Sequence, residues 1–335
     1  MSGDEILTTE EFRARVGRLA QGLLAQYELS SKASVTMINH SENVTYRVDD
    51  PDRDRKTILR VHRAGYHSRQ GIWSELEWLQ ALRRDAGVET PVPIAAKDGS
   101  VIQRVGSAEL PQERYAVMFE FMAGHEPPED NLVGPFERLG EVTARLHLHA
   151  KAWRQPAGFT RHTWDYEAMF GAKPTWGRWQ DGLGVTGEAK KTLQRLAEAL
   201  KRRLGAYGQG GERFGLVHAD LRLANLLLEG ERTKVIDFDD CGFSWYLYDL
   251  GSALSFIEHK PEVPELVASW VKGYRTVAPL LAEDEAEIDT FILTRRLLLV
   301  AWIGSHAETE LAQSQGIPFT EGACRLTESY LGRFG

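Results

Sequence analysis

The stretch 217–243, VHADLRLANLLLEGERTKVIDFDDCGF, places two polar clusters beside two short apolar runs. His218, Asp220 and Asn225 precede the first run, and Asp237 follows the second. If the two runs pair as strands, Asp237 returns beside Asn225. A carboxylate and an amide oxygen can then share a divalent cation such as Mg²⁺, which prefers oxygen ligands. A second carboxylate remains to orient a hydroxyl or accept its proton, and these are the groups that phosphoryl transfer requires.

The spacing of these residues matches the kinase pattern H-x-D-x4-N followed by D-F-x. The matching segments here are HADLRLAN and IDFDD. The competing interpretation is that each acid only caps a turn or a helix. That interpretation suits Asp239 and Asp240 singly, which stay open between substrate contact and turn chemistry, but it does not account for the whole set.

The same chemistry needs a cation on the third strand and an acid on the following helix to hold the phosphates. The segment TILRVHR offers Arg60 at the position where kinases have Lys, and a guanidinium presents a fork of donors to phosphate oxygens. Glu75 and Glu77 are candidate partners in SELEWLQAL, and Glu75 is preferred because it shares the inward stripe with Ile72. The alternative for Arg60 is a surface cation on a strand.

The turn between the first two strands, NHSENVTY, has no glycine-rich motif to cover phosphates. Backbone N–H groups of Ser41, Glu42 and Asn43 are expected to bind phosphate instead, as in anion nests. Taken alone, this turn indicates only a hairpin. Backbone groups of Glu120 and Met122 in FEFMAG are candidates to bond the adenine edge, with a core strand ending at a turn as the alternative.

The elements that must position these groups change character along the chain. Apolar periodicity predicts a first helix, then a three-stranded meander, a second helix and two more strands. Beyond about residue 125 the pattern is mainly helical, which makes the chain α+β, with a seam near Gly124–Asp130 and a ligand cleft between the two parts. The expected helices span 10–27, 68–87, 131–153 and 187–204 and stretches within 262–282 and 284–313; the expected strands are 33–40, 43–50, 56–63 and stretches within 91–105 and 114–126.

The composition bounds the class of protein. The 335 residues include 42% hydrophobic and 26% charged residues, as in ordinary globular proteins, and the formal net charge of −8 argues against a nucleic-acid partner. Two cysteines without Cys/His spacing indicate neither a zinc site nor a disulfide framework. The acidic start MSGDEILTTEEF has no signal-peptide pattern, and LLLVAWIG is too short to span a bilayer. A cytoplasmic protein with no membrane partner is expected, as a monomer or a homodimer.

With these motifs identified, the sequence resembles the aminoglycoside phosphotransferase/choline kinase-like family, which has the protein-kinase-like fold. The resemblance runs from about Ser34 to about Ala307 and includes HSENVTYRV, ILRVHR, SELEWLQAL, ARLHLHA, HADLRLAN and IDFDDCGFSWYLYDL. The last segment looks most like the bacterial homoserine kinase-like and hydroxylysine kinase-like members. The resemblance implies a bilobal fold. Its N-terminal nucleotide lobe, residues 1–125, has a five-stranded antiparallel sheet with one helix, and its helical C-terminal lobe is 126–335.

The resemblance also implies roles for single residues. It makes Asp220 the catalytic Asp, and Asn225 and Asp237 the Mg²⁺ ligands. Asp249 would brace the catalytic loop, and His218 would support it by hydrogen bonding. Arg222 could stabilise the transferred charge, or contact substrate or solvent. Ala219 departs from the family, whose usual form has Gly at this position.

The expected activity is ATP- and Mg²⁺-dependent phosphorylation of a small-molecule hydroxyl, with GTP left open as donor. Four tryptophans between Lys151 and Gly211, together with acids, favour a cationic acceptor by cation–π attraction, while a local tryptophan core is the alternative. Because cationic side chains are close by in the sequence, a substrate carboxylate is also possible. The acceptor could therefore be an amino alcohol, a hydroxy amino acid or an aminoglycoside-like compound; a Ser/Thr protein kinase and a weakly active pseudokinase are the competing functions. The residues concerned are Trp153, Trp164, Trp176, Trp179, Asp165, Glu167, Asp181, Arg161, His162, Lys173 and Arg178.

Two further interpretations concern residues that could be mistaken for reactive groups. His147 and His149 are two positions apart in ARLHLHA, so that on a helix they diverge and make a poor metal pair. We expect His147 to be packed and His149 to be exposed. Cys241 is expected to be a small buried side chain.

Overall fold

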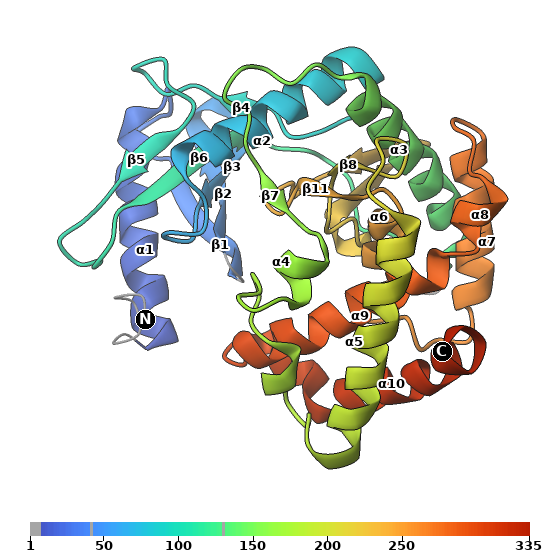
Figure 1. The fold of residues 1–335 in the computed structure, drawn as a ribbon. Helices are drawn as coiled ribbons and strands as arrows, with labels where there is room; N and C mark the ends of the chain where they lie inside the picture. Colours follow the sequence, from blue (N-terminus) through green and yellow to red (C-terminus); the bar gives the residue numbers. More distant parts are fainter. Residues whose placement is uncertain (1–7, 41–42, 129–130) are drawn as a thin grey trace. The chain divides into compact units, whose positions relative to one another are not determined.

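The computed structural model describes residues 8–40, 43–128 and 131–335. By its internal contacts the chain divides into two compact units. Unit 1 comprises the described residues within 1–81, 90–123 and 155–160, and unit 2 those within 82–89, 124–154 and 161–335. Figure 1 shows the elements along the chain. The expected lobes, 1–125 and 126–335, stay a prediction, and two residues of the expected seam, 129 and 130, lie outside the described residues.

Unit 1 contains an antiparallel sheet with the strand order β1-β2-β3-β6-β4, and β5 also pairs with β6. The meander predicted for 33–40, 43–50 and 56–63 is confirmed. Its register sets Arg60 on β3 opposite Thr45 on β2 and Val117 on β6. The strands are β1 Ser34–His40, β2 Val44–Asp50, β3 Arg55–Val61, β4 Pro93–Ile94, β5 Gln103–Val105 and β6 Arg114–Glu120.

The described sheet has six strands, not the five that were expected. The segment 91–105 forms two short strands because a turn interrupts it. The Asp98 carboxylate accepts a hydrogen bond from the Ser100 backbone N–H at 2.9 Å, and Gly99 adopts a φ of 82°, a conformation that suits glycine. Both short strands then pair with β6, since β4 meets its C-terminal half and β5 its N-terminal half.

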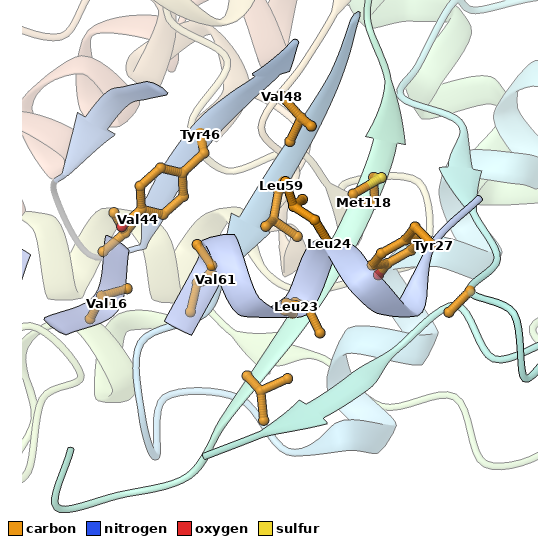
Figure 2. Packing of buried hydrophobic residues seen from close by; sticks show 14 of the residues in the cluster. Val16, Leu23, Leu24, Tyr27, Val44, Tyr46, Val48, Leu59, Val61 and Met118 are labelled. Atoms are coloured by element: carbon orange, nitrogen blue, oxygen red, sulfur yellow. The ribbon is translucent and has the colours of Figure 1, made fainter. Parts of the chain in front are cut away.

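Helix α1 (Thr9–Leu23) covers one face of this sheet. A capping box starts it: the Thr8 side chain accepts from the Glu11 N–H, and the Glu11 carboxylate accepts from the Thr8 N–H. The helix then lays its apolar stripe on alternate residues of the strands, and each large side chain buried there stabilises the unit by about 1.5–3 kcal/mol. Figure 2 shows this cluster, which includes Val16, Leu23, Leu24, Tyr27, Val44, Tyr46, Val48, Leu59, Val61 and Met118.

The other face of the sheet carries the polar groups. Successive side chains of a strand point to opposite faces, so that Leu59 and Val61 enter the α1 core while Arg60 points the other way. Helix α2 (Arg69–Ala81) lies on that face, and its Ile72 and Glu75 are buried. The helix continues as a π turn to Ala86 and ends before Gly87, as the sequence predicts.

Unit 2 is mainly helical, as expected. Helices α3 and α7 lie so close together that their contact requires glycine. A Cβ on Gly140 would lie 2.0 Å from the Trp270 carbonyl oxygen, and one on Gly273 would lie 1.8 Å from the Glu137 carbonyl oxygen. Helices α5, α9 and α10 pack together (Figure 1). The α-helices described in unit 2 are α3 Val133–Ala152, α4 Tyr166–Phe170, α5 Gly187–Tyr207, α6 Tyr248–Ala253, α7 Val263–Arg275, α8 Ala282–Glu285, α9 Ile288–Ser305 and α10 Glu310–Phe334.

The sequence pattern did not predict α10 as a helix. Gly316 has a non-helical φ of 53° and Pro318 follows it, so that the apolar period is interrupted inside this segment. The apolar stretch 297–304 is part of a buried helix, as expected: it lies in α9, which is buried over nearly its whole length. Across the part of the chain that the structure describes, no helix is both long enough and apolar enough to cross a membrane.

Short strands of unit 2 flank the two polar clusters. Strand β11 (Gly242–Trp245) pairs with β8 (Phe214–Val217) and with β7 (His162–Thr163). Strands β9 (Leu226–Glu229) and β10 (Arg232–Val235) form an antiparallel hairpin. The two polar clusters of the sequence therefore lie in the loop between β8 and β9 and in the loop between β10 and β11.

Candidate active site

The loop between β8 and β9 is held in a tight bend. Ala219 adopts a φ of 68°, a left-handed conformation that costs a non-glycine residue about 1–2 kcal/mol. The Asp249 carboxylate accepts hydrogen bonds from the backbone N–H groups of His218 at 3.2 Å and Ala219 at 2.8 Å. The Ser252 hydroxyl accepts from the Leu221 N–H at 2.9 Å. Side chains of helix α6 thus hold the backbone of the loop, and Asp249 has the bracing contacts that were expected of it.

His147 supports this brace from α3. Its Nε2 lies 3.0 Å from an Asp249 carboxylate oxygen, and its Nδ1 lies 3.1 Å from the Tyr274 hydroxyl. Burial lowers the pKa of His147 despite the nearby Asp249 carboxylate. The imidazole is therefore neutral at pH 7, with Nε2–H donating to Asp249.

His149 is not exposed, contrary to expectation. It is 8% exposed, and its Nε2 lies 3.6 Å from the Asp85 carboxylate. The expectation failed because the π turn at the end of α2 covers this part of α3, a contact between segments far apart in sequence. The other expectation, that His147 is packed, is confirmed, since it is 1% exposed.

His218 links the two polar loops. Its Nε2 donates to the Ile236 carbonyl oxygen at 3.0 Å, and its Nδ1 accepts from the Asp220 backbone N–H at 3.3 Å. A carbonyl can only accept, so this geometry places the proton on Nε2. His218 orders the loop by hydrogen bonding, as the sequence suggested.

Asp220 is held by three side chains. Its Oδ2 accepts from Arg222 Nε at 3.1 Å and from Asn225 Nδ2 at 2.9 Å. Its Oδ1 accepts from Arg295 at 2.5 Å. Burial raises the pKa of the Asp220 carboxyl, but the charges of Arg222 and Arg295 act against it, and the resulting pKa lies below the usual range. The group is an ionised carboxylate with a fixed orientation.

Arg295 was not singled out in the sequence. It lies in the middle of α9, is 2% exposed, and reaches Asp220 across 75 residues of chain. A signal was present, because a charged pair inside an otherwise apolar helix must find buried acids. The sequence could not show which acid each of Arg295 and Arg296 would meet.

Asn225 and Asp237 lie next to each other through the β9–β10 hairpin. The hairpin register pairs Val235 with Leu226, and the Ile236 N–H donates to the Asn225 carbonyl oxygen at 2.9 Å. The Asn225 side-chain nitrogen faces Asp220, which leaves its oxygen Oδ1 as the possible ligand. Asp237 is exposed and adopts a φ of 60°.

These oxygen donors fit a hard divalent cation. The described residues contain no group of three or more His, Cys, Asp or Glu side chains arranged for a metal ion. One amide and one carboxylate suit a cation that takes its remaining ligands from phosphate oxygens and water, as Mg²⁺ does in kinases. The assignment of Asn225 and Asp237 as ligands stays a prediction.

The remaining acids of the second loop have different environments. Asp239 is 6% exposed, and its carbonyl oxygen accepts from the Arg161 side chain, which also donates to the Cys241 carbonyl at 2.6 Å. The Asp240 carbonyl accepts from Trp164 Nε1 at 2.8 Å. Burial acts to lower the pKa of Arg295, but Tyr248 and the charges of Asp220 and Asp240 raise it. Arg161 is therefore a brace for this loop. Cys241 is fully buried, as expected.

The residues predicted to contact nucleotide lie in unit 1. Arg60 and Glu75 form an ion pair of 2.6 Å, with side chains 8% and 1% exposed. The Arg60 guanidinium also lies 5.2 Å from the centre of the Phe119 ring. Arg60 is thus not a surface cation, and Glu75 is its acid. Their contact with phosphate stays a prediction.

The other residues that were predicted to contact nucleotide have different environments. The Asn43 side chain accepts from the Arg63 backbone N–H at 2.9 Å and so ties β2 to the end of β3. The Glu120 N–H donates to the Val92 carbonyl at 2.9 Å, so that only its carbonyl is left for an adenine contact. Met122 is partly exposed after the end of β6. Ser41 and Glu42 lie outside the described residues.

The tryptophan-rich segment forms a local core. Trp164, Trp176 and Trp179 are at most 6% exposed, and the rings of the first two are 5.0 Å apart. Asp165 caps α4, since its side chain accepts from the Ala168 N–H at 2.8 Å. The face of Trp176 is next to a protein cation, because the Arg295 guanidinium lies 5.4 Å from the ring centre.

Comparison with known proteins identifies the family. Residues 34–287 match the model of the phosphotransferase enzyme family, which includes the whole of both polar loops. The chain belongs to this family. The members are phosphotransferases, and the chain is accordingly a small-molecule kinase that phosphorylates hydroxyl groups. The protein-kinase-like α+β fold and the resemblance to aminoglycoside phosphotransferases and choline kinases are confirmed.

Three relatives illustrate the range of the family. A microcompartment-associated aminopropanol kinase is 46% identical, with a TM-score of 0.88 over 95% of this chain and 98% of its own. The amicoumacin kinase of Bacillus subtilis (strain 168) is 25% identical over 256 residues, 73% of this chain and 72% of that protein. An amicoumacin kinase solved in complex with AMP-PNP, Ca²⁺ and Ami is 20% identical, with a TM-score of 0.75 over 96% and 95% of the two chains, and shares the fold.

Proposed function

We propose that this chain transfers the γ-phosphoryl group of ATP, with Mg²⁺, to the hydroxyl of a small amino alcohol. The observation that carries the proposal is the Asp220 carboxylate, held by Arg222, Asn225 and Arg295 in a loop that the hairpin brings beside Asp237. This arrangement supports a role like that of a kinase catalytic loop, in which an Asp orients the acceptor hydroxyl.

In the proposed reaction, Asp220 accepts a hydrogen bond from the acceptor hydroxyl and orients its oxygen toward the γ-phosphorus. The new O–P bond forms as the bond to the ADP oxygen breaks, and the hydroxyl proton passes to Asp220. A carboxylate with a lowered pKa is a weak base, so that we expect orientation first and proton transfer late, as suits a loose transition state. Asn225 and Asp237 would hold Mg²⁺, which supplies charge neutralisation on the phosphates.

Arg60 and Glu75 are proposed to hold the α- and β-phosphates. Their ion pair of 2.6 Å is buried and matches the cation–acid pair that kinases use for this purpose. Because the guanidinium has several N–H groups, Arg60 can keep Glu75 and still donate to phosphate oxygens. Lysine at this position would have the charge but not the planar fork.

Two features support an amino alcohol as acceptor. The relative that is 46% identical across 95% of this chain is an aminopropanol kinase. In addition, Asp240 follows the proposed Mg²⁺ ligand Asp237 by three residues, and its charge is one of those that raise the pKa of Arg295, the partner of Asp220. We propose that Asp240 pairs with the substrate ammonium. The tryptophans contribute a rigid frame instead of a cation cage, because they are buried in one another.

An acceptor panel tests this proposal. ADP release is measured with aminopropanol, ethanolamine, a hydroxy amino acid, spectinomycin and the propanediol that lacks the amine. We expect kcat/KM for aminopropanol to exceed that for propanediol at least about tenfold, since a hydrogen bond to a charged group contributes about 1.5–3 kcal/mol and each ~1.4 kcal/mol is a factor of ten. Asp240→Asn should remove this preference, whereas Asp181→Asn, which changes an exposed acid, should keep it. Equal use of the diol would contradict the assignment of the ammonium site.

A further inference from the structure

Arg295 has an unusual combination of burial and contacts. It is 2% exposed, so that its guanidinium is not available to a substrate from solvent. Its NH2 donates to Asp220 Oδ1 at 2.5 Å, on the carboxylate oxygen that Arg222 and Asn225 do not contact. The two oxygens of Asp220 are therefore held by different parts of the chain, one by α9 and one by the loop itself.

The guanidinium is itself fixed on three other sides. Its Nε donates to the Ser255 hydroxyl at 2.9 Å, and its NH1 donates to the Tyr248 hydroxyl at 3.2 Å and the Ala219 carbonyl at 3.3 Å. The Trp176 ring covers its face at 5.4 Å. A planar group with this many fixed contacts has little freedom to turn, which is why its grip on Asp220 is directional.

We propose that Arg295 is a positioning residue for phosphoryl transfer: it sets the rotation of the Asp220 carboxylate so that the acceptor hydroxyl is aimed at the phosphorus. The proposal rests on the proposed function. Without Arg295, the Asp220 carboxylate keeps its hydrogen bonds from Arg222 and Asn225 to Oδ2, but Oδ1 is no longer held and the carboxylate can rotate. A small misplacement of the orienting group is enough to lower the rate about a hundredfold.

The neighbouring residue provides a matched control. Arg296 follows Arg295 on the same buried helix, but it donates to Glu258 at 2.8 Å and to the Phe319 carbonyl at 2.7 Å. Its partners lie in the segment between α6 and α7 and in α10, and not in the polar loops. Replacing Arg296 with Lys disturbs α9 at the adjacent position without touching Asp220.

The test compares steady-state kinetics of Arg295→Lys, Arg295→Met and Arg296→Lys with aminopropanol. We expect Arg295→Met to lower kcat about a hundredfold with the KM values for both substrates changed less than about threefold, and Arg295→Lys to lower kcat less. Arg296→Lys should keep kcat within about twofold. A rise in KM with unchanged kcat, or unchanged kinetics in both Arg295 variants, would overturn the proposal.

Two further measurements separate positioning from stability. Methylguanidinium added to Arg295→Ala should restore part of kcat, since it can occupy the vacated contacts, whereas a purely structural loss would not respond. If Arg295→Met does not fold, Tyr248→Phe and Ser255→Ala still decide, because each keeps Arg295 and removes one of its anchors. Each should lower kcat several-fold at constant KM, and unchanged kcat in both would overturn the proposal. A wild-type enzyme without turnover on any acceptor would overturn the proposed function as well.

Discussion

Arg295 and Arg296 are adjacent on α9, and both are 2% exposed. The pKa values of the acids that they contact nevertheless shift in opposite directions. Arg295 pairs with Asp220, where the combined charge of two arginines outweighs burial and the pKa of the acid falls. Arg296 pairs with Glu258, where burial outweighs the single arginine and the pKa of the acid rises. Burial of the acid is thus met by an excess of positive charge at Asp220 and by a single arginine at Glu258.

The difference teaches how to tell a site from a core when both contain buried ion pairs. Around Glu258 the pair is closed: its side chains are 2% and 0% exposed, and the Arg296 guanidinium lies 3.4 Å from the centre of the Phe319 ring. Around Asp220 the carboxylate stays 15% exposed and has more positive partners than it needs for neutrality. An excess of donors that leaves an acid accessible indicates function, and a closed one-to-one pair indicates packing.

The largest expected effect breaks the core pair. Arg296→Met should lower the free energy of unfolding by about 3–5 kcal/mol, because it leaves Glu258 buried without its cation. Chemical denaturation measures the loss, and kcat of the folded enzyme should stay within about twofold. The double variant Arg296→Met/Glu258→Leu should recover most of the stability, since apolar replacement of both partners is often neutral. A double variant as unstable as the single one would show that the ion pair is not the cause.

A smaller effect concerns the pH dependence of the loop brace. The pKa of His147 is lowered by burial, so that on acidification below about pH 6.5 the unfolded chain takes up a proton that the folded protein does not. Stability is therefore lost as the pH falls, by at most about 1.4 kcal/mol per pH unit from this group. His147→Gln should be less stable at pH 7.5 but should show a flatter curve between pH 6.5 and 5. His259→Gln is the control, because His259 is exposed and lies outside the brace, so this variant should keep the wild-type slope. A wild-type slope retained in His147→Gln would contradict the neutral brace.

The smallest effect is expected at Ala219, whose carbonyl joins Arg295 to the loop. Ala219→Gly relieves a left-handed residue but adds freedom to the unfolded chain, and these two terms oppose each other. We expect a change in stability within about 1 kcal/mol and kcat within about threefold. Thermal unfolding and steady-state kinetics measure both. A tenfold loss of kcat would mean that the stiffness of this bend, and not only the contact with Arg295, aligns Asp220.

Local spacing predicted much of the site. The distance from His218 to Asn225 and the following hairpin were enough to bring Asp237 back beside Asn225, because strand pairing is set over a few residues. The helical stripe likewise identified Glu75 as the partner of Arg60. The roles of these residues with nucleotide and metal stay predictions, but their mutual placement followed from the period of the strands and of the helix.

What the sequence did not show depends on contacts between distant segments. The pairing of Arg295 with Asp220 is a tertiary choice, and the burial of His149 depends on the turn after α2. Asp165 looked like a substrate acid but caps α4, which only the start of that short helix reveals. The strand count changed for a local reason, because the turn at Asp98 divides segment 91–105 into two short strands.

The central claim is that Asp220 directs phosphoryl transfer to the hydroxyl of an amino alcohol. The most direct measurement follows the phosphorus by ³¹P NMR during incubation with ATP, Mg²⁺ and aminopropanol, for the wild type and for Asp220→Asn. We predict a phosphomonoester of aminopropanol formed in equal amount with ADP by the wild type, and a rate at least about a hundredfold lower in Asp220→Asn with ATP binding retained. Formation of the ester at the wild-type rate by Asp220→Asn, or no ester from the wild type, would contradict the account.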